Sequence, residues 1–229
     1  FLFLLGIVTS LSLPPYNYVI ANFFTFSFFF FFFFYKSKTI HNKKLFFLYG
    51  WLFGFGYFIS NIYWVTISLT FDESFKFLIP IALIVIPAFL AIFYGTITYL
   101  FILFKQKKLI SSFLIFSLIF GIMEFIRGFI LTGFPWNLIA YSFSNQLKIV
   151  SIISIIGTYG FNLFCISLFI SPAIFFLRET KKDILVSGVF IIMISIFYIY
   201  GTSYENKFKA SNIDTNTFKI RIIGSNISL

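Results

Sequence analysis

Residues 78–104 read LIPIALIVIPAFLAIFYGTITYLFILF. This stretch contains no charged residue over its whole length. A helix needs about 20 consecutive apolar residues to cross the hydrocarbon core of a bilayer. The stretch therefore predicts a helix that spans a membrane.

The composition of the whole chain agrees with this prediction. Of its 229 residues, 60% are hydrophobic, 24% are aromatic and only 10% are charged. Soluble globular domains carry roughly a quarter of charged residues, and disordered chains are poor in aromatic residues. Both classes are excluded, and a membrane protein with several spans remains.

Outward from residues 78–104, apolar segments alternate with short polar breaks along residues 1–200. Without water in the bilayer core, each segment has to satisfy its backbone hydrogen bonds internally, as a helix does. We therefore predict an all-α polytopic transmembrane helix bundle of about seven spans. The predicted segments are 1–13, 19–35, 45–69, 78–104, 109–131, 149–177 and 184–200.

Basic residues are distributed unevenly among the linkers. The linkers after the second, fourth and sixth segments hold ten of them: Lys36, Lys38, Lys43, Lys44, Lys105, Lys107, Lys108, Arg178, Lys181 and Lys182. The alternate linkers hold only Lys76 and Lys148. Cytoplasmic loops carry the excess of Lys and Arg, so we expect these three linkers in the cytoplasm and the C-terminal tail outside it. The net charge of +10 then reports topology and not nucleic-acid binding.

Phenylalanine is unusually abundant, with 40 residues and an unbroken run from Phe28 to Phe34. Together with abundant Ile, Asn and Lys, this indicates a coding bias toward A- and T-rich codons. We expect the run to be lipid-facing filler and not an aromatic binding site.

Two ionisable residues lie inside a predicted span, Glu124 and Arg127. At a spacing of three they share one helix face and can pair. Intramembrane ionisable residues usually face a bundle interior or a cavity. The pair is thus either a structural ion pair or a polar floor beneath a lipid cavity, where Arg127 would grip a phosphate or carboxylate.

An apolar, aromatic segment begins at residues 132–137, TGFPWN, and lies outside the predicted spans. One interpretation is that these aromatic residues form the ordinary aromatic belt of a membrane interface. The other is a re-entrant or surface-lying segment that shapes a lipid entrance.

A cluster of glycines and aromatic residues runs from Gly50 to Val65. Gly50, Gly54 and Gly56 place small residues on one helix, which lets neighbouring helices approach closely. Tyr63 and Trp64 would lie toward the outer interface. We interpret this cluster as packing and anchoring.

The remaining residues are weak candidates for catalysis or metal binding. Cys165 is the only cysteine, so it forms no disulfide within the chain, and a buried thiol without a neighbouring base is inert. His41 lies alone in a Lys-rich linker. We expect no metal site and no cofactor.

Both ends of the chain suggest a fragment of a longer protein. The chain begins with Phe1, and the segment 1–13 is too short to span a bilayer. Residues 201–217 are polar and indicate an extracytoplasmic linker, and residues 218–223, FKIRII, alternate as a strand does. We expect residues 218–229 to begin a second domain.

Four motifs resemble the apolipoprotein N-acyltransferases of bacterial inner membranes, and they follow one another along the chain in the order found in that family. They are Glu124–Gly128 (EFIRG) running into 131–136 (LTGFPW), the turn Pro14-Pro15-Tyr16, the stretch Gly50–Leu69, and 220–227 (IRIIGSNI). The last resembles the first strand of that family's α/β nitrilase-like domain.

The resemblance implies a membrane bundle that carries an extracytoplasmic nitrilase-like domain. In that family a Glu–Lys–Cys triad in this domain passes an acyl chain from a phospholipid to a lipoprotein's diacylglyceryl cysteine, through a thioester. The triad belongs to a region beyond Leu229, so we expect no catalytic residue in this chain and no activity of the chain alone. The nitrilase-like domain would then be a separately encoded partner.

The resemblance also assigns a role to the membrane motif. We expect its residues to shape a lipid-binding cavity: Glu124, Arg127, Thr132, Gly133, Pro135 and Trp136. Two alternatives stay open. The chain would be a non-catalytic remnant, or a small lipid-binding membrane protein or permease with Glu124 and Arg127 as its transport site.

Overall fold

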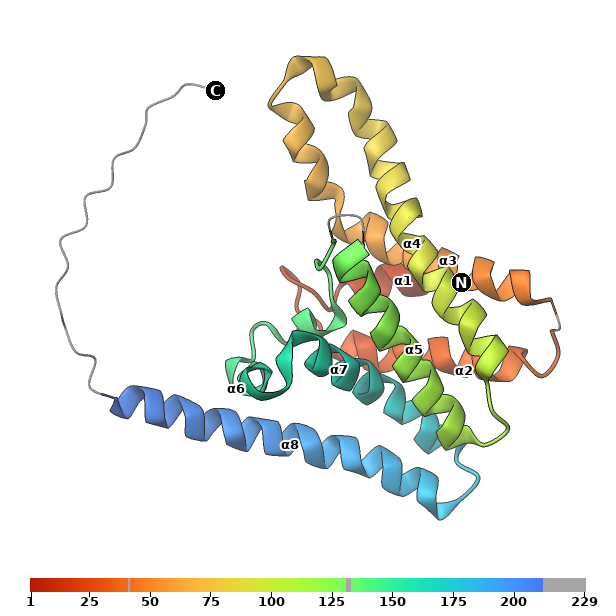
Figure 1. The fold of residues 1–229 in the computed structure, drawn as a ribbon, viewed down its shortest axis with the longest axis vertical. Coiled ribbons are helices and arrows are strands. Elements are labelled where there is room, and N and C mark those ends of the chain that lie inside the picture. The colour runs from red at the N-terminus through yellow and green to blue at the C-terminus, as the bar shows by residue number, and fades with distance from the viewer. Residues whose placement is uncertain (41, 131–132, 212–229) are drawn as a thin grey trace.

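The computed structural model describes residues 1–40, 42–130 and 133–211, and this part of the chain is a bundle of helices without strands (Figure 1). The long helices are α2 (Ile20–Lys36), α3 (Lys43–Asn61), α4 (Ile79–Phe104), α5 (Leu109–Phe129), α7 (Ile153–Leu177) and α8 (Lys181–Ala210). The short ones are α1 (Leu2–Ser10), η1 (Tyr63–Thr70), η2 (Glu73–Leu78), η4 (Ile139–Phe143) and α6 (Leu147–Val150). The predicted all-α transmembrane bundle is confirmed.

Fewer helices meet the length and hydropathy of a membrane span than the seven segments predicted. Within the described residues, four helices are long and apolar enough to cross: α4 extended by η2, α5, α7 and α8. A fifth is reached if α3 and η1 count as one span bent by 48°. Helix α2 has 17 residues and α1 has nine, and both are shorter than the roughly 20 residues that a crossing needs. The seven crossings therefore stay a prediction.

Two predicted segments differ in detail from the structure. The segment 45–69 breaks at Ile62, where the side chains of Ser60 and Asn61 bond back to the carbonyls of Gly56 and Tyr57. Such side-chain bonds compete with the regular helix ladder. The segment 149–177 is interrupted at Gly157, whose φ of 70° is open to glycine.

The C-terminal part of the bundle is longer than predicted. We expected a polar linker from residue 201, but α8 continues without a break to Ala210. An i,i+4 pair between Glu205 and Lys209 supports its last turns. The expected strand at 218–223, like the rest of the linker beyond Ser211, lies outside the described residues.

The run of phenylalanines is mostly core, so its interpretation as lipid-facing filler is wrong. Phe29, Phe30 and Phe33 are fully buried, whereas Phe28 and Phe31 are exposed. The Phe29 ring stacks on Phe53 of α3 at 4.0 Å between centroids. A run of one residue type still has an inner and an outer face on a helix of 3.6 residues per turn, and tertiary packing uses the inner one.

Glycines set the close approach of three helices, as the sequence predicts. A Cβ on Gly50 would lie 2.5 Å from the Tyr94 carbonyl oxygen of α4, and one on Gly54 would lie 2.7 Å from Tyr94 Cβ. On another face of α3, a Cβ on Gly56 would lie 2.1 Å from the Phe3 carbonyl oxygen of α1. Small residues therefore let α1, α3 and α4 pack backbone to backbone.

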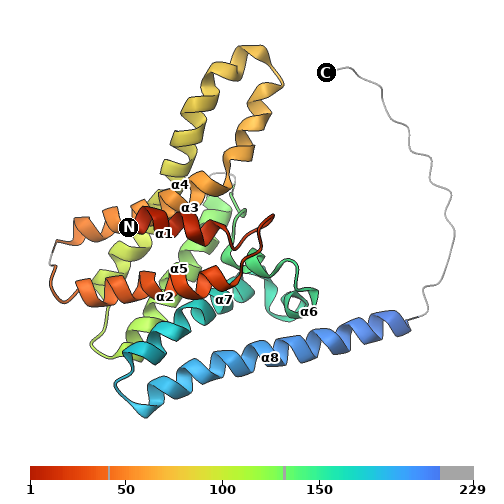
Figure 2. The same cartoon turned by 180° about the vertical axis from the view of Figure 1, so that it is seen from behind.

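The two ends of the bundle differ in charge. The last residues of α2, α4 and α7 lie at one end, with the first residues of α3, α5 and α8 (Figures 1 and 2). We call this the basic end, because the ten linker Lys and Arg residues belong there. The turn after α1, the segment from Gly133 to Ile152 and the last turn of α8 lie at the opposite end.

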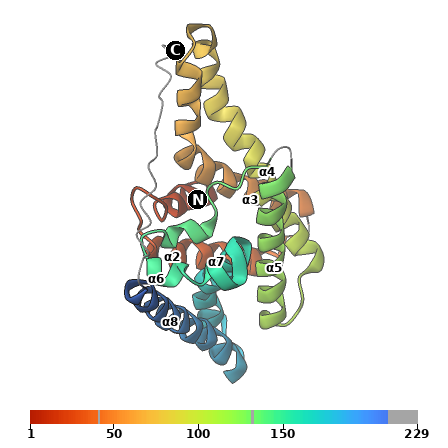
Figure 3. The ribbon, with the colours of Figure 1, turned by 60° about the vertical axis from the view of Figure 1, so that its left-hand side comes forward.

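Two parts project from the bundle. At the opposite end, η1, η2 and the first turns of α4 form a hairpin arm (Figure 3). At another margin, α8 packs against α6 and α7. Only 17% of the most apolar 18-residue stretch of α8 is buried against the rest of the bundle. The exposed residues of α8 between Ile184 and Ile199 are almost all apolar, as a lipid-facing helix surface should be.

Candidate functional site

A cavity of about 460 Å³ opens at the opposite end of the bundle. Three segments that are distant in the sequence form its walls. They are the turn after α1 with Pro14, Pro15 and Tyr16, the junction of α3 and η1 with Asn61 and Trp64, and the segment from Trp136 to Ser144. Its size is typical of small-molecule sites.

The turn after α1 is held by its own side chains. Asn17 adopts a left-handed φ of 57°, a conformation that asparagine tolerates better than most residues. Its side-chain amide donates to the Pro15 carbonyl at 3.0 Å. This leaves the Tyr16 ring exposed at the rim of the cavity.

Gly133 introduces the segment that carries the Trp136 wall of the cavity. Gly133 has a φ of +82°, and a Cβ there would lie 2.4 Å from the Gly128 carbonyl oxygen. The Phe134 amide donates to the Arg127 carbonyl at 3.0 Å. Glycine adopts a positive φ without steric cost, so Gly133 lets the chain fold back against the last turn of α5.

The ion pair predicted from the sequence exists and is fully buried. The Arg127 and Glu124 side chains meet in a two-pronged contact, with Nη2 2.7 Å from Oε2 and Nε 3.3 Å from Oε1. Both residues are 1% exposed. The guanidinium carbon lies 5.3 Å from the centre of the buried Phe58 ring. Removing one partner of such a pair costs about 3–5 kcal/mol, because it leaves a buried charge uncompensated.

The remaining donors of Arg127 hold the cavity wall. Its Nη1 donates to the Phe134 carbonyl at 2.8 Å and to the Trp136 carbonyl at 2.9 Å. From α3, the Tyr57 hydroxyl donates to the Asn137 carbonyl at 2.8 Å. Buried side chains on two helices therefore hold three carbonyls of the 134–137 segment.

This anchoring leaves the Trp136 side chain free to face the cavity. Trp136 is 54% exposed, and its indole lies 5.2 Å, centre to centre, from the indole of Trp64. The Tyr141 hydroxyl closes the segment with a bond to the Pro135 carbonyl at 3.2 Å. The result is an aromatic wall on a rigid backbone.

The predicted site residues occupy different positions in this arrangement. Trp136 lines the cavity, Gly133 and Pro135 shape the segment that carries it, and Glu124 and Arg127 lie beneath that segment. Thr132 lies outside the described residues. Because four N–H groups of Arg127 already bond to protein oxygens, the ion pair acts on the cavity through the backbone.

Several cavity residues were not predicted as site residues. Asn61, Asn137, Tyr141 and Ser144 line the cavity, and Tyr57 anchors it. Tyr57 lies in the stretch Gly50–Leu69 singled out above, but nothing in the sequence distinguishes it there from Tyr63 as an anchoring residue. The left-handed Asn137 follows a Pro-Trp pair, and that turn chemistry is the one signal that was available.

The other candidates lie apart from the cavity. Cys165 is fully buried in α7. Across the described residues, no three His, Cys, Asp or Glu side chains come together as a metal site would require. His41 lies outside the described residues.

Comparison with known proteins gives a consistent result. Residues 5–171 match the model of the apolipoprotein N-acyltransferase N-terminal domain. A protein of Rickettsia typhi named apolipoprotein N-acyltransferase is 35% identical over 201 residues, which are 87% of this chain and 39% of the relative. A protein of the same name from Rhizobium rhizogenes is 30% identical over 86% of this chain and 38% of its own length. The chain thus spans about two fifths of the length of these relatives.

Proposed function

This chain belongs to the apolipoprotein N-acyltransferase family, and from that premise we propose that its bundle is the lipid-handling part of an acyl transfer. The donor would be a membrane phospholipid. The acceptor would be the N-terminal diacylglyceryl cysteine of a lipoprotein. The names of its relatives from Rickettsia typhi and Rhizobium rhizogenes support the reaction class.

We place the chain in a bacterial inner membrane, with the basic end in the cytoplasm. The ten-to-two distribution of basic residues supports this orientation through the positive-inside rule. The 460 Å³ cavity and the last turn of α8 would then face the periplasm. Lipid would reach the cavity from the outer leaflet.

The main support for the proposal is the set of residues that surround the 460 Å³ cavity. Three motifs that resemble the family, at Pro14–Tyr16, at Tyr63–Trp64 and at Trp136, meet at one cavity although they are far apart in the sequence. The buried Glu124–Arg127 pair, part of the same resemblance, fixes the wall that carries Trp136. We assign Trp136 to lipid contact, and Glu124 and Arg127 to positioning.

The covalent chemistry would be supplied by a nitrilase-like domain, as the resemblance implies. Its cysteine thiolate would attack an ester carbonyl of the phospholipid, forming a thioester as the lysophospholipid leaves with a proton. The lipoprotein amine would then attack the thioester, forming an amide and releasing the thiol. Cys165 is unsuited to this role, because it is buried within α7.

A chimera tests the proposal. Residues 1–210 would replace the matching region of the Rickettsia typhi relative in a strain depleted of its own N-acyltransferase. We expect a third acyl chain on lipoprotein N-termini by mass spectrometry, and none when this chain is expressed alone. A chimera that reaches the membrane yet leaves lipoproteins diacylated would contradict the proposal.

A further inference from the structure

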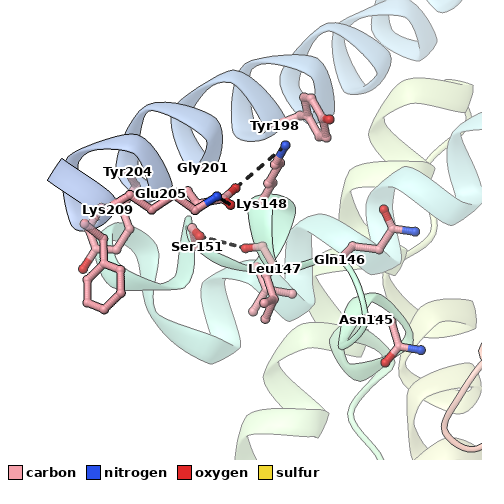
Figure 4. Close-up of a pocket in the computed structure, with 12 residues that line it drawn as sticks. Asn145, Gln146, Leu147, Lys148, Ser151, Tyr198, Gly201, Tyr204, Glu205 and Lys209 are labelled. Atoms are coloured by element: carbon pink, nitrogen blue, oxygen red, sulfur yellow. Dashed lines mark hydrogen bonds and ion pairs between the residues drawn. The ribbon is translucent and has the colours of Figure 1, made fainter.

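A second and larger cavity lies at the opposite end of the bundle. It is a groove of about 820 Å³ between the segment 145–151, which includes α6, and the last turns of α8 (Figure 4). None of its lining residues lines the 460 Å³ cavity. The role proposed above does not use it.

The walls of the groove are in direct contact at its base. A Cβ on Gly201 would lie 1.8 Å from the Lys148 carbonyl oxygen, so α8 and α6 touch backbone to backbone there. Nearby, the hydroxyls of Ser154 and Tyr200 lie 3.1 Å apart. The groove therefore has a fixed floor.

Three charged side chains line the groove. Lys148 Nζ on α6 lies 3.8 Å from Glu205 Oε2 on α8, and Lys209 Nζ lies 2.5 Å from Glu205 Oε1 (Figure 4). Lys148 Nζ also lies 5.2 Å from the centre of the Tyr198 ring. Two ammonium groups around one carboxylate leave a net charge of +1, and all three side chains are more than a third exposed.

The groove lies at the depth where α8 leaves the apolar phase. Residues 184–200 of α8 are almost wholly apolar, whereas 201–210 read GTSYENKFKA. Tyr198, Tyr200 and Tyr204 mark this change, as aromatic residues do at membrane interfaces. Phospholipid head groups occupy the same depth.

We propose that this groove binds the phosphodiester of a membrane phospholipid. Lys148 and Lys209 would contact the phosphate oxygens, and the Tyr204 and Phe208 rings that line the groove would pack against the glycerol and the first methylenes. A free phosphate would satisfy the same lysines, but the rings and the interfacial depth favour the lipid. The inference rests on the membrane placement of the chain and not on acyl transfer.

The test is lipid retention by the purified full chain in detergent, measured by native mass spectrometry during titration with phosphatidylglycerol. Each lysine would supply a charge-assisted hydrogen bond to the phosphate, so the double variant Lys148→Gln/Lys209→Gln should bind this lipid at least tenfold more weakly. Lys207→Gln is the matched control, because Lys207 is on the same helix but does not line the groove. Equal binding by the double variant and the control would overturn the proposal.

A third variant separates binding from a purely structural bridge. Glu205→Gln raises the net charge of the groove from +1 to +2, and we expect it to bind phosphatidylglycerol several-fold more tightly. If the three charges only join α8 to α6, this variant would bind no better than the wild type, and the proposal would fail.

Two further ligands identify the source of the phosphate. We expect glycerol 3-phosphate and diacylglycerol each to bind far more weakly than phosphatidylglycerol. Glycerol 3-phosphate binding as tightly would indicate a site for soluble phosphates, and diacylglycerol binding as tightly would exclude recognition of the phosphate. Either result would overturn the proposal, and neither depends on acyl transfer.

Discussion

The buried guanidinium of Arg127 donates to the backbone carbonyl of Trp136 at 2.9 Å, while Trp136 itself is 54% exposed in the cavity wall. One residue is enclosed by protein and the other faces the cavity, and a single hydrogen bond joins them. A charge inside the bundle thereby fixes the position of an aromatic side chain at its surface.

Arg127→Ala should destabilise the bundle strongly. It leaves the Glu124 carboxylate buried without its cation and frees two carbonyls of the 134–137 segment, and the expected loss is about 3–5 kcal/mol of unfolding free energy. Arg127→Lys keeps the charge but not the planar fork, so its loss should be smaller. Chemical unfolding in detergent micelles measures both, and equal stability of the two variants would refute the role of the fork.

Replacing both Glu124 and Arg127 should separate the effect of the pair on the stability of the bundle from its effect on the position of the 134–137 segment. Buried ion pairs exchanged for apolar residues of similar volume are often neutral for stability. Glu124→Leu/Arg127→Met should therefore be more stable than Arg127→Ala. The 134–137 segment should nevertheless be cleaved faster by limited proteolysis, because its carbonyls lose their donor. Wild-type resistance to cleavage would show that the segment is held by other contacts.

Glycine substitutions should distinguish packed from open helix faces. Gly56→Ala brings a Cβ within 2.1 Å of the Phe3 carbonyl oxygen, and overpacking of this kind costs about 1–3 kcal/mol. Gly188→Ala in α8 meets nothing within 4 Å. It should be tolerated, or should stabilise α8 by up to about 1 kcal/mol through helix propensity. Thermal unfolding in one detergent compares the two, and equal effects would contradict the packing of α1 on α3.

Lys105, just beyond the end of α4, should make stability depend on pH. Burial and the nearby Lys38 charge hold the pKa of Lys105 below its ordinary value of 10.5. Between the lowered pKa and 10.5 the unfolded chain binds more protons than the folded one, so stability should rise with pH across that window.

Lys105→Met removes the titrating group and should remove this contribution. Wild type should therefore gain stability relative to Lys105→Met between pH 7 and pH 10, as measured by Tm. Lys107→Met is the matched control in the same linker. A constant difference in Tm between wild type and Lys105→Met would contradict the effect of burial.

The sequence was sufficient for features that depend on local patterns. Apolar segments predicted the helices, and the spacing of Glu124 and Arg127 predicted their pairing, because residues three apart on a helix are neighbours. The glycines of α3 predicted close packing, because residues without a side chain let a neighbouring helix approach. These features need only the geometry of one helix.

Features that depend on distant contacts were missed. The burial of Phe29 arises from packing on Phe53, and the anchoring of Asn137 arises from Tyr57. No periodicity reports either contact. The extra turns of α8 were missed because a polar sequence such as 201–210 suits both a linker and a solvated helix whose Glu205 pairs with Lys148 and Lys209.

If Trp136 lines a cavity for the lipid of an N-acyl transfer, the chimera needs its indole for acylation. The measurement is lipoprotein N-acylation by the chimera carrying Trp136→Ala. Phe104→Ala is the control, because Phe104 is exposed at the basic end, away from the cavity. Loss of one aromatic anchor costs about 2 kcal/mol or more, which predicts at least tenfold slower N-acylation for Trp136→Ala and no change for Phe104→Ala, at equal amounts in the membrane. Equal N-acylation by the two variants would contradict the claim.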